Sequence, residues 1–178
     1  MELCEMENVQ LCKGSLKITM KDIITGNEEI REGNNIIVTV ASELMAELMR
    51  GVLGDLVRVQ VDGIRTLAVG SGGVWDLQNP PAATVTQTTL ETEIYRKEFD
   101  SVNYIDGLGA ISLTRTNIID LTTVFDTTEA NGALVEMGLF GGTDSLLTNL
   151  GTMVNYFTFP VLNKTSNSNL TILWRLVF

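Results

Sequence analysis

Two glutamates, Glu91 and Glu93, lie two residues apart in a segment that alternates like a β-strand, so their side chains share one face. Paired carboxylates can carry out general acid–base catalysis without histidine. The chain contains no histidine, which excludes Ser-His and Cys-His nucleophile pairs and histidine-ligated zinc within one chain. A glycosidase needs two carboxylates across a cleft, and nothing here suggests a sugar-stacking aromatic array. The interpretation we favour is a solvated strand face.

Two further segments have the composition of ligand-binding loops. Residues 70–73 read Gly-Ser-Gly-Gly. A phosphate loop needs a helix directly behind its glycines and usually a lysine, whereas this segment leads into Pro80-Pro81. Asp126, Glu129 and Asn131 offer oxygen ligands for calcium in a short turn, without the EF-hand spacing. We interpret both segments as turns, and the sequence predicts no catalytic, cofactor or metal site.

The composition narrows the class of protein. The 178 residues include 12 Lys and Arg against 22 Asp and Glu, which gives a net charge of −10. Phosphate backbones repel such a chain, so we expect no nucleic-acid partner. The N-terminus has neither the basic start nor the apolar run of a secretory signal, and no stretch approaches the roughly 18 apolar residues of a membrane span. We expect synthesis in a cytoplasm and no membrane partner.

The two cysteines, Cys4 and Cys12, do not make a disulfide framework or a four-ligand zinc site. We interpret them as small reduced residues that are mostly buried, and a local hairpin disulfide remains the alternative. With 44% apolar and 19% charged residues, the chain has enough apolar surface for a sizeable core. Its length suits one domain.

The periodicity of the chain is mainly that of β-strands. Alternation at residues 16–20 and turn residues at 25–27 predict an N-terminal hairpin. Apolar residues at helical spacing predict one amphipathic helix over residues 39–53. After residue 56, strand patterns recur about every 10–15 residues between Gly, Asn and Asp turns. We therefore predict a mainly β protein, an antiparallel β-sandwich or jelly roll. An N-terminal arm and hairpin would occupy residues 1–33, and the sandwich domain residues 34–178.

The last predicted strand, residues 170–178, is apolar on both faces. Such a strand is either central in a sandwich or covered by a neighbouring subunit. One face carries five large apolar residues, and the other carries Leu173 and Val177. The candidate subunit-interface residues are Leu170, Ile172, Leu173, Trp174, Leu176, Val177 and Phe178.

Several short segments occur in an order that resembles a known pattern. They are LAVGSG at residues 67–72, TTLETEIYR at 88–96, EANG at 129–132, VEMGLF at 135–140 and LTILWRLVF at 170–178. This order resembles the head domain of tail-collar and fibre proteins of tailed bacteriophages, and related small virion proteins. The resemblance extends from about residue 34 to residue 178, and the order of the segments carries it.

The resemblance implies a non-enzymatic β-sandwich that assembles as a symmetric homo-oligomer, with a trimer favoured. The protein would lie on the outer surface of a capsid or tail, with the major capsid protein or tail and collar proteins as partners. Glu93, Arg96 and Glu136 would form a partly buried charge arrangement. Fibre proteins continue into a long shaft, whereas this sequence ends after its last core strand. We therefore expect a capsid decoration, or cement, protein. A tail, collar or baseplate adaptor that anchors a fibre is the alternative, and a carbohydrate-binding module is a remote one.

Overall fold

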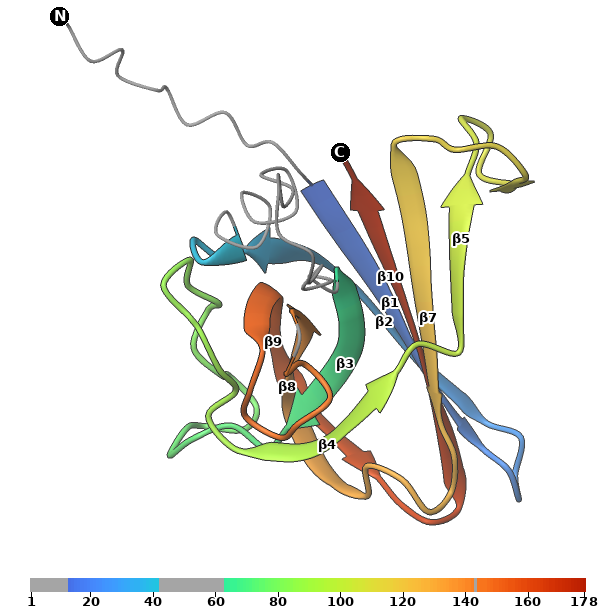
Figure 1. Cartoon of the computed structure of the whole chain (residues 1–178). Helices are drawn as coiled ribbons and strands as arrows, with labels where there is room; N and C mark the ends of the chain where they lie inside the picture. The colour runs from blue at the N-terminus through green and yellow to red at the C-terminus, as the bar shows by residue number, and fades with distance from the viewer. Residues whose placement is uncertain (1–12, 42–62, 143) are drawn as a thin grey trace, which may run out of the picture.

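The computed structural model describes residues 13–41, 63–142 and 144–178 (Figure 1). Within these ranges, ten antiparallel strands form one sheet in the order β4-β3-β8-β9-β2-β1-β10-β7-β5-β6, which confirms the mainly β class. The strands are β1 (Lys13–Asp22), β2 (Glu28–Ile37), β3 (Ile64–Gly70), β4 (Glu93–Glu98), β5 (Ser101–Ile105), β6 (Ile111–Ser112), β7 (Ile118–Phe125), β8 (Gly132–Gly141), β9 (Thr152–Lys164) and β10 (Ser168–Val177).

Strand β2 joins the two halves of the sheet. Its first part pairs with β1, and its last residues, Ile36 and Ile37, pair with β9. The half made of β4, β3, β8 and β9 and the half made of β1, β10, β7, β5 and β6 share one hydrophobic core. Leu67 of β3, Met137 of β8 and Trp174 of β10 all belong to this core and are fully buried. The sheet therefore curls so that its inner faces meet, as Figure 1 shows.

The two ends of the curled sheet are joined at a corner. Strands β4 and β5 lie far apart in the strand order, yet only Phe99 and Asp100 separate them in the chain. The amide of Asp100 donates to the carbonyl of Thr122 at 2.8 Å, and Lys97 Nζ donates to the carbonyl of Val124 at 2.9 Å. These bonds hold the end of β4 against β7.

The alternation predicted at the C-terminus is confirmed, but the apolar residues face the chain's own core. Strand β10 lies between β1 and β7, and its side chains alternate between buried and half-buried. Leu170, Ile172, Trp174 and Leu176 lie in the chain's own core, each at most 1% exposed. The prediction that these four residues form a subunit interface is therefore wrong, because burial within the chain leaves them no surface for a partner.

The predicted N-terminal hairpin is present as β1 and β2. Asp22 shapes its turn by accepting the amides of Ile24 and Thr25, and Gly26 supplies a positive φ of 74°. The predicted boundary after residue 33 falls inside β2, and both strands are central in the sheet. In the described residues the hairpin thus belongs to the same sheet as the rest.

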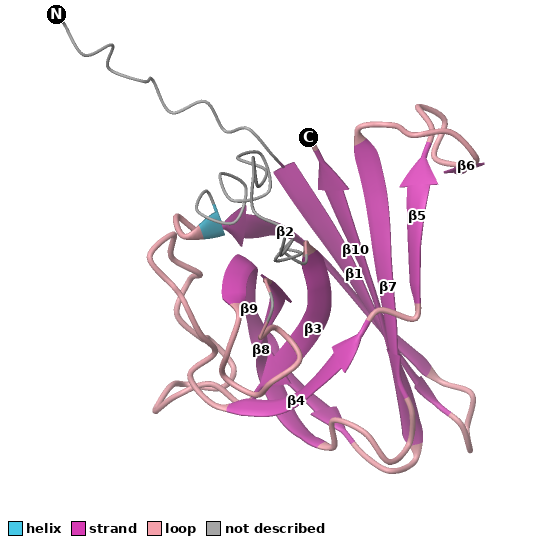
Figure 2. Cartoon of the chain, viewed as in Figure 1, coloured by secondary structure: helices cyan, strands magenta, loops and turns pink. Residues whose placement is uncertain are grey.

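Two N-terminal predictions fall mainly outside the described residues. Residues 42–53 of the predicted helix are among those that the structure does not describe, as are Cys4 and Cys12. In the described part, Thr39 and Val40 lie in a turn and Ala41 alone is helical (Figure 2). The predicted helix is thus not seen in the described residues.

The outer faces of the two halves differ. Over β3, β4, β8 and β9, which we call the covered face, a second hydrophobic cluster lies beneath the loop of residues 71–92. This loop is tied to β9 by bonds from Val161 N to Leu77 O and from Thr158 Oγ1 to Pro81 O, and to the turn after β2 by a bond from Thr39 N to Val85 O. Over β2, β1 and β10, which we call the open face, Lys17, Ile30 and Glu32 are exposed.

Candidate functional site

The carboxylate of Glu136 is the centre of the covered face. Glu136 has no exposed surface. Its Oε1 accepts the amides of Gly72 and Thr92, each at 3.0 Å, and its Oε2 accepts the amide of Glu91 at 3.1 Å. The hydroxyl of Tyr156 donates to Oε2 at 2.8 Å. None of these four donors is a cation, and together they satisfy the buried carboxylate. Glu136 therefore fastens both ends of loop 71–92 to β8.

Gly70 and Gly72 lie where the Glu136 carboxylate and the Trp75 ring leave no room for a side chain. A Cβ on Gly70 would lie 2.5 Å from Glu136 Oε1, and a Cβ on Gly72 would lie 2.5 Å from the Trp75 ring. The backbone of Gly72 also has a φ of +72°, a value that residues other than glycine rarely adopt. The segment that resembles a phosphate loop thus holds the protein's own carboxylate, in irregular backbone that leaves β3 at Gly70 and bends at Gly73.

Tyr156 is a member of this site that sequence reasoning missed. Burial, and then the neighbouring carboxylate of Glu136, raise the pKa of the Tyr156 hydroxyl well above its usual value. The hydroxyl therefore stays protonated and remains a donor. Tyr156 lies in β9, 20 residues from Glu136, and only the pairing of β9 with β8 brings the two together.

A buried ion pair holds the second loop of the covered face, residues 144–151. Arg96 binds Glu93 through two bonds, Nε to Oε1 at 2.9 Å and Nη2 to Oε2 at 2.8 Å, and the side chains are 3% and 1% exposed. Arg96 Nη1 donates to the carbonyls of Ser145 at 2.8 Å and Leu150 at 2.7 Å. Arg96 therefore binds Glu93 and the backbone of this loop at the same time.

Further contacts complete this anchor. The amide of Asn149, which has a positive φ of 59°, donates to Glu93 Oε2 at 3.1 Å. The Arg96 guanidinium lies 3.9 Å from the centre of the Phe140 ring, within cation–π distance. Each charged atom of the pair has a partner, so the arrangement is a structural anchor in a fixed geometry.

The predicted arrangement of Glu93, Arg96 and Glu136 is thus divided in two. The structure brings Glu93 and Arg96 together, whereas Glu136 is satisfied by its own set of donors. All three lie on the covered face. Glu91 is exposed and accepts a bond from Gln87, so Glu91 and Glu93 do not flank a common cleft. The prediction of a solvated face holds for Glu91 and is wrong for Glu93.

In the turn of residues 126–131, two lysine side chains bind the oxygens that could have served as calcium ligands. Lys97 Nζ binds Glu129 Oε2 at 3.0 Å, and Lys164 Nζ donates to Asn131 Oδ1 and to the carbonyl of Asp126. Burial favours a higher pKa for Glu129, but bonds from the Asp126 amide and Lys97 outweigh it and lower that pKa. Burial lowers the pKa of Lys164. Within the described residues, no three His, Cys, Asp or Glu side chains are grouped to hold a metal ion.

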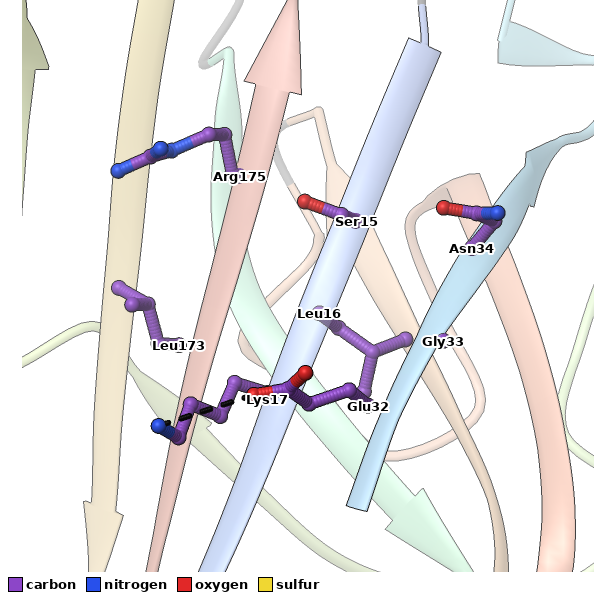
Figure 3. Close-up of a pocket in the computed structure, with 8 residues that line it drawn as sticks. All are labelled: Ser15, Leu16, Lys17, Glu32, Gly33, Asn34, Leu173 and Arg175. Atoms are coloured by element: carbon purple, nitrogen blue, oxygen red, sulfur yellow. Dashed lines mark ion pairs between the residues drawn. The ribbon is translucent and has the colours of Figure 1, made fainter. Parts of the chain in front are cut away.

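The open face carries a shallow groove of about 500 Å³ (Figure 3). Lys17 and Glu32 form an exposed ion pair across it at 3.7 Å. Arg175 makes two bonds to Asp120, at 2.7 and 2.8 Å, which raise the pKa of its guanidinium. The groove is lined by Ser15, Leu16, Lys17, Glu32, Gly33, Asn34, Leu173 and Arg175.

The chemistry of this groove suits contact with a protein surface. Each charged side chain of its lining has a partner of opposite charge, Lys17 with Glu32 and Arg175 with Asp120 outside the groove, so none of them is left to select a small ion. Three of the seven candidate interface residues remain at the surface. Leu173 and Val177 are half-buried on the open side of β10, and Phe178 is 48% exposed.

No family model matches the chain, and no curated protein matches it. In the part of the chain that the structure describes, no helix has the length and apolar character needed to cross a membrane.

Proposed function

We propose that this chain is a non-enzymatic structural protein of a tailed-bacteriophage virion, and that it decorates the outside of the capsid. The order of sequence segments supplies the virion assignment. The observation that supports it most is where those segments meet. Residues 67–72, 88–96 and 135–140 lie in or beside β3, β4 and β8. Glu136, in the third segment, accepts backbone amides from the other two, those of Gly72, Glu91 and Thr92. Chance matches scattered along a chain have no reason to converge on one carboxylate.

The curled sheet is, in this proposal, a variant of the β-sandwich. Its two halves would be the two layers, with β2 as the strand that passes from one to the other. The single hydrophobic core between the inner faces supports this description. Because the covered face is already occupied by its own loops, the open face is the one left for a partner.

The proposed action is protein–protein contact through the open face. Its groove offers paired charges and the partly exposed Leu173, a mixed surface of the kind found in protein interfaces. The net charge of −10 favours a position away from packaged DNA, because phosphates repel an acidic protein. The partner proposed for this face is the major capsid protein.

Microscopy of purified particles of the phage that encodes the chain tests this function. Decoration predicts hundreds of copies in a regular lattice on the capsid. A few copies, or a few tens, at the tail or collar would instead favour the adaptor function. Particles that contain no copy would contradict both.

A pair of variants tests the open face itself. Leu173→Glu places a charge in the groove and is expected to reduce occupancy on particles at least tenfold. The matched control is Ile24→Glu, in the hairpin turn, where the side chain is 72% exposed. Equal occupancy of the two variants would show that the open face is not the contact.

A further inference from the structure

The hairpin formed by β5 and β6 presents a group of exposed apolar side chains. Each is more than one third exposed, and we call the group the hairpin patch. Its members are Val102, Tyr104, Leu108, Ile111 and Leu113. Contiguous exposed apolar groups commonly mark interaction surfaces. Figure 1 shows the hairpin projecting from one corner of the sheet.

Two members of the patch, Val102 and Tyr104, continue the inner, core-facing side of the sheet, whereas Ile111 pairs with Ile105 and lies on the opposite face of the hairpin. Val102 pairs with Leu121 of β7, which is 2% exposed, and Tyr104 pairs with Ile119. Directly paired residues in antiparallel strands have side chains on the same face. The face that forms the core therefore runs past the core to β5, where the described residues leave it exposed.

Among the residues that the structure describes, the backbone of β5 has an unpaired edge beside Val102. Ser101–Asn103 pair with β7 on one side, while β6 pairs only with Tyr104 and Ile105 on the other. An edge strand with free backbone groups is a template for a strand from another chain. The apolar side chains and the free edge thus coincide.

The patch is also almost free of charge. Residues 101–114 contain one charged residue, Asp106, in a chain with a net charge of −10. Phe178 lies nearby, because its amide donates to the carbonyl of Asn117, which follows the hairpin, and its side chain is 48% exposed. Two acidic copies of the chain would meet little repulsion here.

We propose that a second copy of this chain binds at the hairpin patch. The two β5 edges pair antiparallel about a twofold axis near Val102, which brings the Val102 side chains of the two copies together on the inner face of the joined sheet. A twofold axis makes one edge complementary to itself, and no foreign partner of opposite charge is required. This inference does not rest on the virion assignment. It predicts a dimer, in contrast to the trimer that the sequence resemblance implies.

Sedimentation of the full chain across a wide concentration range tests this proposal. The wild type is expected to form a dimer. Val102→Lys puts two like charges beside the axis and is expected to raise the dissociation constant at least tenfold. The matched control, Val85→Lys, changes a valine that is 51% exposed in loop 71–92 and is expected to leave the dimer intact. Thermal unfolding shows whether both variants are folded.

Cross-linking keeps the test decisive if the lysine variant fails to fold. Val102→Cys, made with Cys4→Ser and Cys12→Ser, is expected to form an interchain disulfide on oxidation, and Val85→Cys in the same background is not. A monomeric wild type, a trimer, or equal behaviour of the position 102 and position 85 variants would overturn the proposal. None of these results would bear on where the protein lies in a particle, so the two proposals fail separately.

Discussion

The covered face and the open face belong to one sheet, yet they use charge in different ways. On the covered face, the Glu93–Arg96 pair is 1% and 3% exposed, and its spare donors hold a loop. On the open face, the Lys17–Glu32 pair is 45% and 68% exposed and bonds only across neighbouring strands. Each pair joins an acid to a base, so residue type alone does not separate them.

The difference shows what a charged residue does when loops cover it. A buried charge must be matched atom by atom, and its removal leaves its partners unsatisfied. An exposed pair exchanges its bonds with water at little cost. The covered face is therefore expected to control stability, and the open face is free to serve binding.

The largest effect is expected from Arg96→Met. The change leaves Glu93 buried without a cation and removes the donor to Ser145 and Leu150. Loss of one partner of a buried pair costs about 3–5 kcal/mol in the free energy of unfolding. Denaturant unfolding measures it. A cost no greater than that of an exposed pair would remove the distinction between the two faces.

Glu136→Gln is expected to cost about 1–3 kcal/mol in the free energy of unfolding, because an amide NH₂ replaces an acceptor and faces backbone donors. Limited proteolysis is expected to cleave loop 71–92 faster in this variant than in the wild type. Glu91→Gln is the control, since the Glu91 side chain is exposed and binds only Gln87 among the contacts seen. Equal protease sensitivity of the two variants would show that Glu136 does not anchor the loop.

The raised pKa of Tyr156 predicts that the free energy of unfolding falls at alkaline pH. Because the folded state keeps this hydroxyl protonated, its stabilising effect is complete below the ordinary tyrosine value of 10.0 and is lost as pH rises above that value. Tyr156→Phe is expected to make the free energy of unfolding fall less steeply above that pH. Unfolding curves at a series of alkaline pH values measure the slope. An unchanged slope would mean that the Tyr156 hydroxyl is not buried beside Glu136.

Glu32→Gln, on the open face, is expected to have the smallest effect. An exposed ion pair contributes about 0–1 kcal/mol, and salt reduces that further. Denaturant unfolding at low and high salt measures it. A loss comparable to that of Arg96→Met would show that the open face also carries stability.

The sequence predicted the class of fold and the hairpin because these depend on local periodicity. It also identified which residues of β10 share a face. It did not show that Leu170, Ile172, Trp174 and Leu176 face the chain's own core, since alternation is the same whether a core or a subunit covers the strand.

The charged residues were foreseen as a group, but their partners were not. Gly72 and Glu136 are 64 residues apart in the sequence, and they meet only after β3 pairs with β8. The partners of Glu136 are mainly backbone amides, which every residue possesses and no composition reveals. Arg96 likewise binds backbone carbonyls of a loop about 50 residues away.

Amide hydrogen exchange at Gly72, Glu91 and Thr92 tests the central claim most directly. If the Glu136 carboxylate fastens loop 71–92, these three amides exchange slowly in the wild type, and Glu136→Gln speeds all three together while the β10 amides stay protected. Wild-type exchange at these positions as fast as that of Thr86, an exposed residue of the same loop, or an unchanged rate in the variant, would contradict the account.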